Sequence, residues 1–296
     1  MASETMIDLI GEQKWLDPLE DSVQKAVKDA FAAAGPSGGE IKDFLHGKWL
    51  GHALHPALTD IPVGAWTGAM AFDVMDMIGS GRELRAGADA LVGIGLLGAV
   101  GSALTGTADW ADSYGRARKI GVVHGALNVA ATALYATSFF LRRNRRSRST
   151  GVALSMMGYA LASASAYLGG HLVLGEQMAV DHTATADAGQ PEKFTAVMIE
   201  SDLQERELTR VDAGGVAVLL VRLDGQIQAI ANTCTHMGGP LNEGKLIGDH
   251  AVECPWHCSR FSLRDGSVID GPATFPEPQF EVRVRKGHIE VRAAKK

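Results

Sequence analysis

Cysteine is scarce in this chain of 296 residues, which contains only three. Three thiols are too few for the disulfide framework of a small secreted domain. An excess of positive charge is also missing, because the formal net charge is -6 and the pI is about 5.9, so no nucleic-acid-binding surface is expected. The sequence also lacks a glycine-rich nucleotide-binding loop, so this chain is not expected to bind NAD(P)H or a flavin itself.

Long apolar runs, in contrast, fill the region between residues 61 and 174. Four windows, 61–78, 88–107, 120–141 and 151–174, are long enough to cross about 30 Å of hydrocarbon at about 1.5 Å per residue. Within the second window the stretch ALVGIGLLGAVGSALTG carries no charge, whereas Asp73 and Asp76 interrupt the first. A buried soluble bundle is the alternative, but four such windows in succession favour a four-helix transmembrane bundle over residues 51–176.

The flanking segments have a different character. Residues 1–50 are polar and include WLDPLEDSVQKAVKDAFAAA, which suits an amphipathic surface helix. Residues 177–192 form a linker rich in Ala, Thr, Gly and Asp. Residues 193–296 contain short alternating runs, VAVLLVRL, QIQAIAN, FEVRVRKG and HIEVRA, which predict strands. The sequence therefore predicts a multi-domain chain in which an all-α four-helix transmembrane bundle is followed by an all-β domain.

Two loops between the predicted strands each pair a cysteine with a histidine. Cys234 and His236 lie in CTHMGGPL, and Cys254 and His257 lie in CPWHCSRF. A zinc finger usually needs two to four residues between paired ligands and a helix that carries its histidines. The first pair has only one intervening residue, and no helix pattern surrounds the second. Equal numbers of cysteine and histidine suit a mixed two-iron cluster, with two thiolates on one iron and two imidazoles on the other.

These two motifs resemble those of the Rieske [2Fe–2S] domain, over roughly residues 194–292. The resemblance implies that Cys234 and Cys254 bind an inner iron, that His236 and His257 bind an outer one, and that the run GPATFPEP covers the cluster. The cluster environment that it implies consists of Met237, Gly239, Trp256, Ser259, Phe261 and Pro272.

The motifs depart from those of quinol-oxidising Rieske proteins, and look more like those of Rieske ferredoxins and of the ferredoxin-like domains of oxygenases. The extra disulfide of the quinol-oxidising proteins would fall at Gly239 and Trp256, and Phe261 replaces a tyrosine whose hydroxyl donates to sulfur, although Ser259 remains. Fewer hydrogen bonds predict a potential in the lower part of the roughly -150 to +300 mV Rieske range. We interpret Cys258, where the family usually has glycine, as a tolerated small residue outside the cluster; the alternatives are a spare ligand and a redox-active thiol.

The membrane part also shows a resemblance. HPALTDIPVGAW is similar to the start of an uncharacterised bacterial four-helix membrane domain, over roughly residues 51–175, which has no established chemistry. In an antiparallel four-span order, His55, His124 and His171 fall at one face of the membrane, with His52 as an alternate. We hypothesise that two of these histidines ligate a b-type haem, and the alternative is that they end helices at the headgroup level and bind nothing.

Arginines predict the orientation of this domain. The loop over residues 142–148 contains five of them, and Arg82 and Arg85 lie in the loop between the first two windows. The positive-inside rule therefore places these loops in the cytoplasm and both termini, including the Rieske domain, outside it. We expect a multi-pass protein of the bacterial inner membrane.

The predicted function is that of a membrane-anchored electron-transfer protein that carries one electron on a Rieske [2Fe–2S] cluster, with a relay to haem or quinone in the bundle. The alternatives are a quinol-oxidising oxidoreductase and a redox or iron–sulfur sensor, so whether the chain is an enzyme stays open. The expected partners are the lipid bilayer and a redox protein or quinone. No nucleic acid is expected, and the oligomeric state is open.

Overall fold

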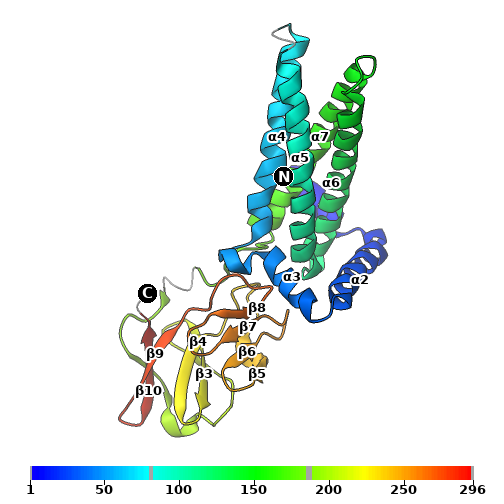
Figure 1. The fold of residues 1–296 in the computed structure, drawn as a ribbon. Coiled ribbons are helices and arrows are strands. Elements are labelled where there is room, and N and C mark those ends of the chain that lie inside the picture. The colour runs from blue at the N-terminus through cyan, green and yellow to red at the C-terminus, as the bar shows by residue number, and fades with distance from the viewer. Residues whose placement is uncertain (1, 80–82, 185–188, 295–296) are drawn as a thin grey trace. The chain divides into compact units, whose positions relative to one another are not determined.

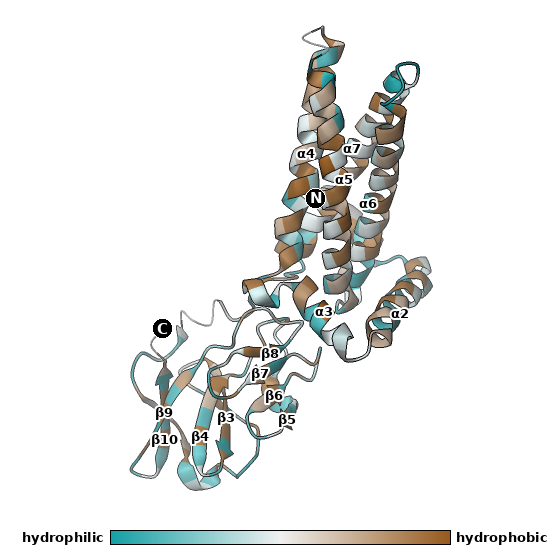
Figure 2. Cartoon of the chain, viewed as in Figure 1, coloured by the Kyte–Doolittle hydropathy of each residue, from teal (hydrophilic) through white to brown (hydrophobic). Residues whose placement is uncertain are grey.

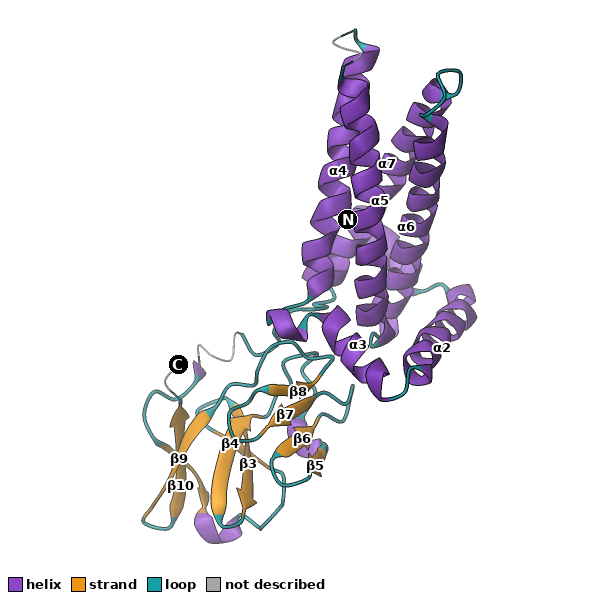
Figure 3. Cartoon of the chain, in the orientation of Figure 1, coloured by secondary structure: helices purple, strands orange, loops and turns teal. Residues whose placement is uncertain are grey.

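The computed structural model describes residues 2–79, 83–184 and 189–294 of the chain (Figure 1). The chain forms two compact units, one from Met1–Ala34 and Leu54–Met178, the other from Gly35–Ala53 and Ala179–Lys296. The first unit is helical and the second contains the strands (Figure 3). The predicted order of a helical region followed by a β domain is therefore confirmed.

The helical unit is built on a bundle of long helices. These are α4 (Leu54–Met77), α5 (Leu84–Ala111), α6 (Gly115–Leu141) and α7 (Arg148–Leu174). Hydrophobic residues run along all of them (Figure 2). In the described part of the chain α5, α6 and α7 are long and apolar enough to cross a membrane, whereas α4, which carries Asp60, Asp73 and Asp76, falls below that standard. The expectation of four membrane spans is thus supported for three helices.

The bundle consists of two tight hairpins. Helix α4 packs along α5 and α6 packs along α7, with far fewer contacts between the two pairs. Trp66 of α4 and Tyr135 of α6 stack between the hairpins with ring centroids 3.9 Å apart. Two further helices, α1 (Ala2–Gly11) and α2 (Asp17–Ala33), are joined by the short η1 (Lys14–Leu16) and pack on the bundle, α1 against α6 and α2 against α5 and α6.

Buried charges in the bundle are paired. Asp76 accepts from Arg85 at 2.8 Å, while Arg82 lies outside the described residues. Asp73, however, pairs with Arg142 at the end of α6, and the two side chains are only 3% and 1% exposed. Arg142 is therefore an internal residue of the bundle rather than part of a solvated loop.

The second unit is a set of small antiparallel sheets. One sheet has the order β1-β10-β9, the next β2-β3-β4 and the third β5-β6-β7-β8. The strands are β1 (Thr195–Ile199), β2 (Thr209–Asp212), β3 (Ala217–Leu223), β4 (Gln226–Ala231), β5 (Lys245–Ile247), β6 (Ala251–Glu253), β7 (Arg260–Ser262), β8 (Val268–Asp270), β9 (Phe280–Arg285) and β10 (His288–Ala293). Short 3-10 helices are η4 (Glu200–Asp202) and η5 (Leu241–Glu243).

Two apolar cores stabilise this unit. One lies around β3, β4, β9 and β10 and includes Val218, Leu220 and Val291. The other includes Cys234, Cys254 and Phe261 and is formed by residues of both the second and the third sheet. Helix α3 (Pro36–His46) and η2 (Lys48–Leu50) belong to the same unit as the strands. The predicted domain boundaries stay predictions.

Candidate metal centre

The two cysteine–histidine motifs lie on two loops with the same backbone pattern. The first loop joins β4 to β5 and the second joins β6 to β7. In the first, Cys234 N donates to Gly239 O and its carbonyl accepts from Gly238 N, both at 2.8 Å. In the second, Cys254 N donates to Ser259 O at 2.8 Å and its carbonyl accepts from Cys258 N at 3.2 Å. The cysteines therefore occupy equivalent places in two matching turns.

Both of these cysteines are buried, Cys234 at 1% and Cys254 at 2% exposure. The Cys234 thiol donates to the sulfur of Cys254, which lowers the pKa of Cys254 to about 7 and raises that of Cys234. Backbone N–H groups of Trp256 and His257 also bond to the Cys254 sulfur, and that of His236 bonds to Cys234. Such N–H donors stabilise the thiolate form, which is the form that binds metal.

The two histidines lie together at the outer side of the loops. The ring centroids of His236 and His257 are 4.8 Å apart with the planes at 85°, and both residues are half-buried. The donor set is thus two adjacent buried sulfurs and two adjacent, more exposed imidazoles. It fits a [2Fe–2S] cluster, whose inner iron takes both thiolates and whose outer iron takes both imidazoles.

The number of converging donors also fits a cluster better than a single ion. Within the described residues no three His, Cys, Asp or Glu side chains converge as a metal-ion site would require. A Rieske cluster needs only two protein ligands for each iron, because sulfide supplies the remaining positions.

The predicted environment residues line these loops. An added Cβ at Gly239 would lie 2.8 Å from Cys254 Sγ and 3.2 Å from the Trp256 ring, so the backbone at residue 239 lies this close to the Cys254 sulfur only because the residue is glycine. Phe261 and Ser259 are fully buried, and Pro272 is buried. Met237 is half-buried, whereas Trp256 is 49% exposed.

The run 271–278 is bonded to both loops. Ala273 N donates to Ser259 Oγ at 3.0 Å, and Thr235 Oγ1 donates to Phe275 O at 2.8 Å. Thr235 N donates to Glu277 Oε1 at 2.8 Å. Glu277 is 2% exposed, and burial raises the pKa of its carboxyl well above the usual value. The sequence reasoning missed Thr235 and Glu277, because nothing in FPEPQF signals that its glutamate is buried.

A second contribution that the sequence reasoning missed comes from α3 and η2. Asp43 accepts from Gly271 N at 3.0 Å and pairs with Lys48, which donates to Ile269 O at 2.6 Å. These bonds hold the start of the same 271–278 run. No local sequence signal identifies them, because the partners lie more than 220 residues apart in the chain, 228 for Asp43 with Gly271 and 221 for Lys48 with Ile269.

The structure brings two of the proposed bundle histidines together. The rings of His55 and His124 lie 6.5 Å apart between centroids. His171 instead lies with Nε2 3.3 Å from Glu176 Oε1, and His52 Nδ1 lies 3.0 Å from Ala53 O.

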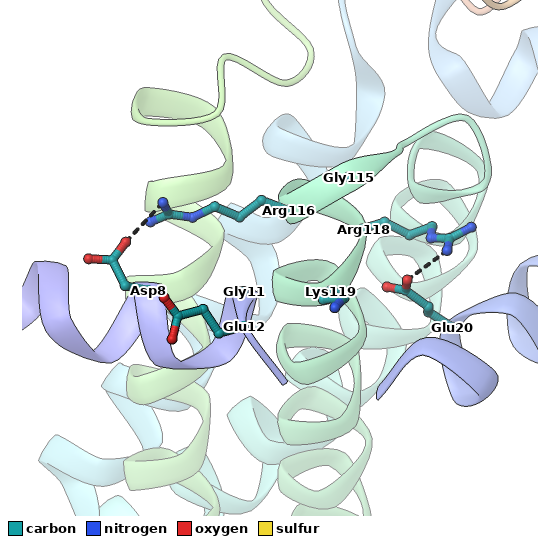
Figure 4. A pocket seen from close by; sticks show the side chains of 8 residues that line it. All are labelled: Asp8, Gly11, Glu12, Glu20, Gly115, Arg116, Arg118 and Lys119. Atoms are coloured by element: carbon teal, nitrogen blue, oxygen red, sulfur yellow. Dashed lines mark hydrogen bonds and ion pairs between the residues drawn. The ribbon is translucent and has the colours of Figure 1, made fainter. Parts of the chain in front are cut away.

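A pocket of about 430 Å³ lies where α1 and α2 meet α6 (Figure 4). Three ion pairs lie here. Arg116 pairs with Asp8 at 2.9 Å and Arg118 pairs with Glu20 at 2.6 Å between nitrogen and oxygen. Lys119 pairs with Asp17 at 2.6 Å. Its cations are thus matched by carboxylates, and these ion pairs join the N-terminal helices to the bundle.

Known families match both parts of the chain. Residues 193–282 match the Rieske [2Fe-2S] domain, and residues 51–183 match the family described as predicted membrane protein (DUF2231). Ferredoxin CarAc of Metapseudomonas resinovorans is 40% identical over 101 residues, which cover 34% of this chain and 94% of that protein. The 3-phenylpropionate/cinnamic acid dioxygenase ferredoxin subunit of Escherichia coli (strain K12) is 36% identical over 89 residues, 30% of this chain and 83% of that protein.

Among solved structures, a match is found in the complex of reduced oxygenase and oxidized ferredoxin in carbazole 1,9a-dioxygenase. It is 33% identical, covers 36% of this chain and 97% of that chain, and has a TM-score of 0.33. By the matches in sequence, this chain belongs to the Rieske [2Fe–2S] domain family and carries an N-terminal domain of the predicted membrane protein family DUF2231.

Proposed function

We propose that this protein is a membrane-bound carrier of single electrons, with its Rieske cluster as the carrier and a haem or quinone in the helical unit as a second redox group. The observation that carries the proposal is the pairing of two buried cysteines with two more exposed histidines on matching loops. Bound there, a [2Fe–2S] cluster supplies one-electron redox chemistry.

The protein residues shape this chemistry in two ways. Backbone N–H groups donate to both cysteine sulfurs and so favour their thiolate forms, and the fully buried Phe261 lies in the same apolar core as both cysteines. The half-buried His236 and His257 stand between that core and solvent, so they provide the side from which a partner reaches the centre.

The partner we propose is a second redox protein that docks on this histidine side, next to the exposed Trp256. Support comes from the relatives, since one is a dioxygenase ferredoxin subunit and another occurs in a complex of oxygenase and ferredoxin. An exposed tryptophan is also typical of protein interfaces.

We further propose that the cluster lies on the extracytoplasmic side of the bacterial inner membrane. Arg143, Arg145 and Arg146 remain exposed in the loop between α6 and α7, which supports a cytoplasmic position for that loop.

The test is a redox titration of full-length protein in mild detergent, in which the EPR signal of the reduced cluster is measured at each potential. We expect one electron per cluster, with the EPR signal lost in His236→Ala and in His257→Ala but retained in His250→Ala, a histidine that lies outside both motifs. Adding a quinol analogue together with an artificial one-electron acceptor separates the functions, because steady oxidation of the quinol without another protein would show a quinol-oxidising enzyme. A chain that binds zinc and accepts no electron would contradict the proposal.

A further inference from the structure

The two hairpins of the bundle repeat one another. The sequence His-x-Ala-Leu occurs at residues 55–58 in α4 and again at 124–127 in α6. The same interval of 69 residues separates Asp73 from Arg142 and Trp66 from Tyr135. In α5 and α7, Ser102 matches Ser165, Gly106 matches Gly169, and Gly95 matches Gly158, again at a constant spacing.

The structure makes these matches spatial as well. An added Cβ at Gly106 would lie 2.7 Å from the His55 ring, and one at Gly169 would lie 2.9 Å from the His124 ring. In the same way, Gly95 makes room for Trp66 and Gly158 for Tyr135. Two hairpins in the same orientation are related by a pseudo-two-fold axis along the bundle. Residues that match and face this axis therefore meet one another across it.

Three matched pairs lie along the axis at successive levels. At one level Asp73 and Arg142 form hydrogen bonds, and at the next Trp66 and Tyr135 stack at 3.9 Å. At the third level His55 and His124 neither stack nor form an ion pair. Their ring centroids are 6.5 Å apart and the ring planes lie at 86°. The histidine level is thus the one at which the matched side chains stand apart.

Each histidine ring is instead held by its own hairpin. His55 Nδ1 lies 2.9 Å from the carbonyl oxygen of Ser102, and His124 Nδ1 lies 2.8 Å from that of Ser165. A carbonyl only accepts, so both Nδ1 atoms carry the proton and both Nε2 atoms carry a lone pair. Asn128 Nδ2 lies 3.1 Å from His124 Nε2, as a donor to that lone pair. A backbone acceptor on one ring nitrogen with a lone pair on the other is the usual arrangement of a metal-binding histidine.

We propose that His55 and His124 are the two axial ligands of one haem b, bound between the hairpins, with the Asn128 amide displaced from His124. Metal–imidazole bonds are about 2.0 Å and the bonding nitrogen lies about 1.1 Å from the ring centre, so two axial rings on one iron have centres about 6 Å apart. The distance of 6.5 Å between His55 and His124 matches this value.

The number of ligands favours haem over a bare ion. Within the described residues no third His, Cys, Asp or Glu joins this pair as a metal site would require. Two imidazoles leave a bare ion with an incomplete shell, whereas a porphyrin supplies four nitrogens and needs only two axial ligands. This proposal rests on the proposed electron-transfer function and gives it a second one-electron centre.

The test is the haem content of full-length protein in mild detergent, before and after incubation with haemin. We expect one haem per chain by pyridine haemochrome, with sharp bands in the reduced-minus-oxidised spectrum. His55→Ala and His124→Ala are expected to lose these bands. His171→Ala and His52→Ala, the matched controls, are expected to keep them. His124→Met, which replaces imidazole by thioether, is expected to keep haem at a higher potential, and a purely structural histidine would not move that potential.

Three results would overturn this assignment. These are the absence of haem from the wild type even after incubation with haemin, equal loss of haem from the control variants, and haem that persists in both alanine variants. The EPR signal of the cluster is recorded in every sample and reports folding. A normal cluster signal without haem defeats this proposal alone, whereas loss of the cluster signal from the wild type defeats the proposed function.

Discussion

At the scale of single residues, Cys258 has a backbone that suits glycine better than cysteine. Its φ is +60°, and it occupies the same place in its loop as Gly238, whose φ is +77°. A side chain in the left-handed region costs about 1–2 kcal/mol. Glycine removes this cost, but it also makes the unfolded chain more flexible, which cancels part of the gain in stability. We therefore expect Cys258→Gly to stabilise the protein by about 0.5–1 kcal/mol and to raise the temperature at which cluster absorbance is lost by about 2 °C.

The control for this prediction is Cys258→Ala, which keeps the strained φ and is expected to gain nothing. An altered EPR signal in either variant would show that Cys258 is a cluster ligand after all.

Gly239 is expected to be essential for cluster binding. A Cβ there would lie 2.8 Å from Cys254 Sγ, which is held in place by the backbone of its own loop. Gly239→Ala should displace that sulfur and lower iron content at limiting iron by about tenfold. Gly189→Ala places its Cβ in ordinary contact, 3.5 Å from Val216, and should bind iron normally. Full iron content in Gly239→Ala would show that the loop opens easily.

Ser259 is expected to tune the potential. Its buried oxygen accepts from Ala273 N at 3.0 Å, so its own proton is available to another acceptor in the core that contains both cysteines. Loss of one hydrogen bond of about 1 kcal/mol corresponds to about 40 mV for a one-electron couple. Ser259→Ala should therefore titrate about 40 mV below the wild type, and Ser267→Ala, on an exposed turn, should not differ. An unchanged potential in Ser259→Ala would remove this residue from the cluster environment.

At the scale of elements, the pair of Asp73 on α4 and Arg142 on α6 joins the two hairpins. Both side chains are almost fully buried, so Asp73→Asn leaves the Arg142 charge buried with Asp89, 3.2 Å away, as its remaining carboxylate partner. We expect Asp73→Asn to lower the free energy of unfolding by about 3 kcal/mol, as measured by thermal denaturation in detergent. Asp76→Asn breaks a more exposed pair with Arg85 and should cost under about 1 kcal/mol.

A double variant separates charge from packing. Asp73→Leu combined with Arg142→Met removes both charges, and it should recover most of the stability that Asp73→Asn loses. If the double variant is as unstable as Asp73→Asn, the geometry of the ion pair, and not the unpaired charge, is what stabilises the bundle.

The elements themselves were largely predictable from sequence, but several partners were not. Alternation along VAVLLVRL and HIEVRA predicted strands, which the structure confirms as β3 and β10. The partner of Asp73 was not predictable, because Arg85 is much nearer in the chain than Arg142 and hydropathy contains no information on which helices meet. The assignment of α3 to the strand-containing unit was missed for a similar reason. The sequence pattern predicts that a polar helix lies at a surface, but it does not indicate which unit that helix packs against.

The same limit applies at the candidate sites. The spacing of cysteine and histidine predicted two paired loops, which the structure confirms as neighbours, because this pattern depends on residues close together in the chain. That these four residues bind the cluster stays a prediction. The approach of His55 to His124 depends on a repeat whose halves differ at most positions. Histidine, serine and glycine persist in both halves, while tryptophan matches tyrosine and aspartate matches arginine. A scan for hydrophobic windows does not detect such a repeat.

At the scale of the whole molecule, the number of membrane spans decides where the N-terminus lies, while the side of the Rieske domain depends only on the arginine loop between α6 and α7. Arg142 and Arg148, at the two ends of that loop, pair with aspartates of the bundle, whereas Arg143, Arg145 and Arg146 are exposed. Replacing these three by asparagine should mix the orientations without breaking a buried pair. Replacing Arg142 should instead destabilise the bundle.

Reporters fused to each terminus in turn then distinguish three spans from four. A C-terminal phosphatase, which is active only outside the cytoplasm, is expected to be active with either number. An N-terminal reporter is expected outside as well if α4 crosses the membrane, and inside if only α5, α6 and α7 cross. We expect it outside, because α4 packs along α5 and its most deeply buried carboxylate, Asp73, is neutralised by Arg142. A paired aspartate costs far less in a membrane interior than a free one, so apolarity alone underestimates α4.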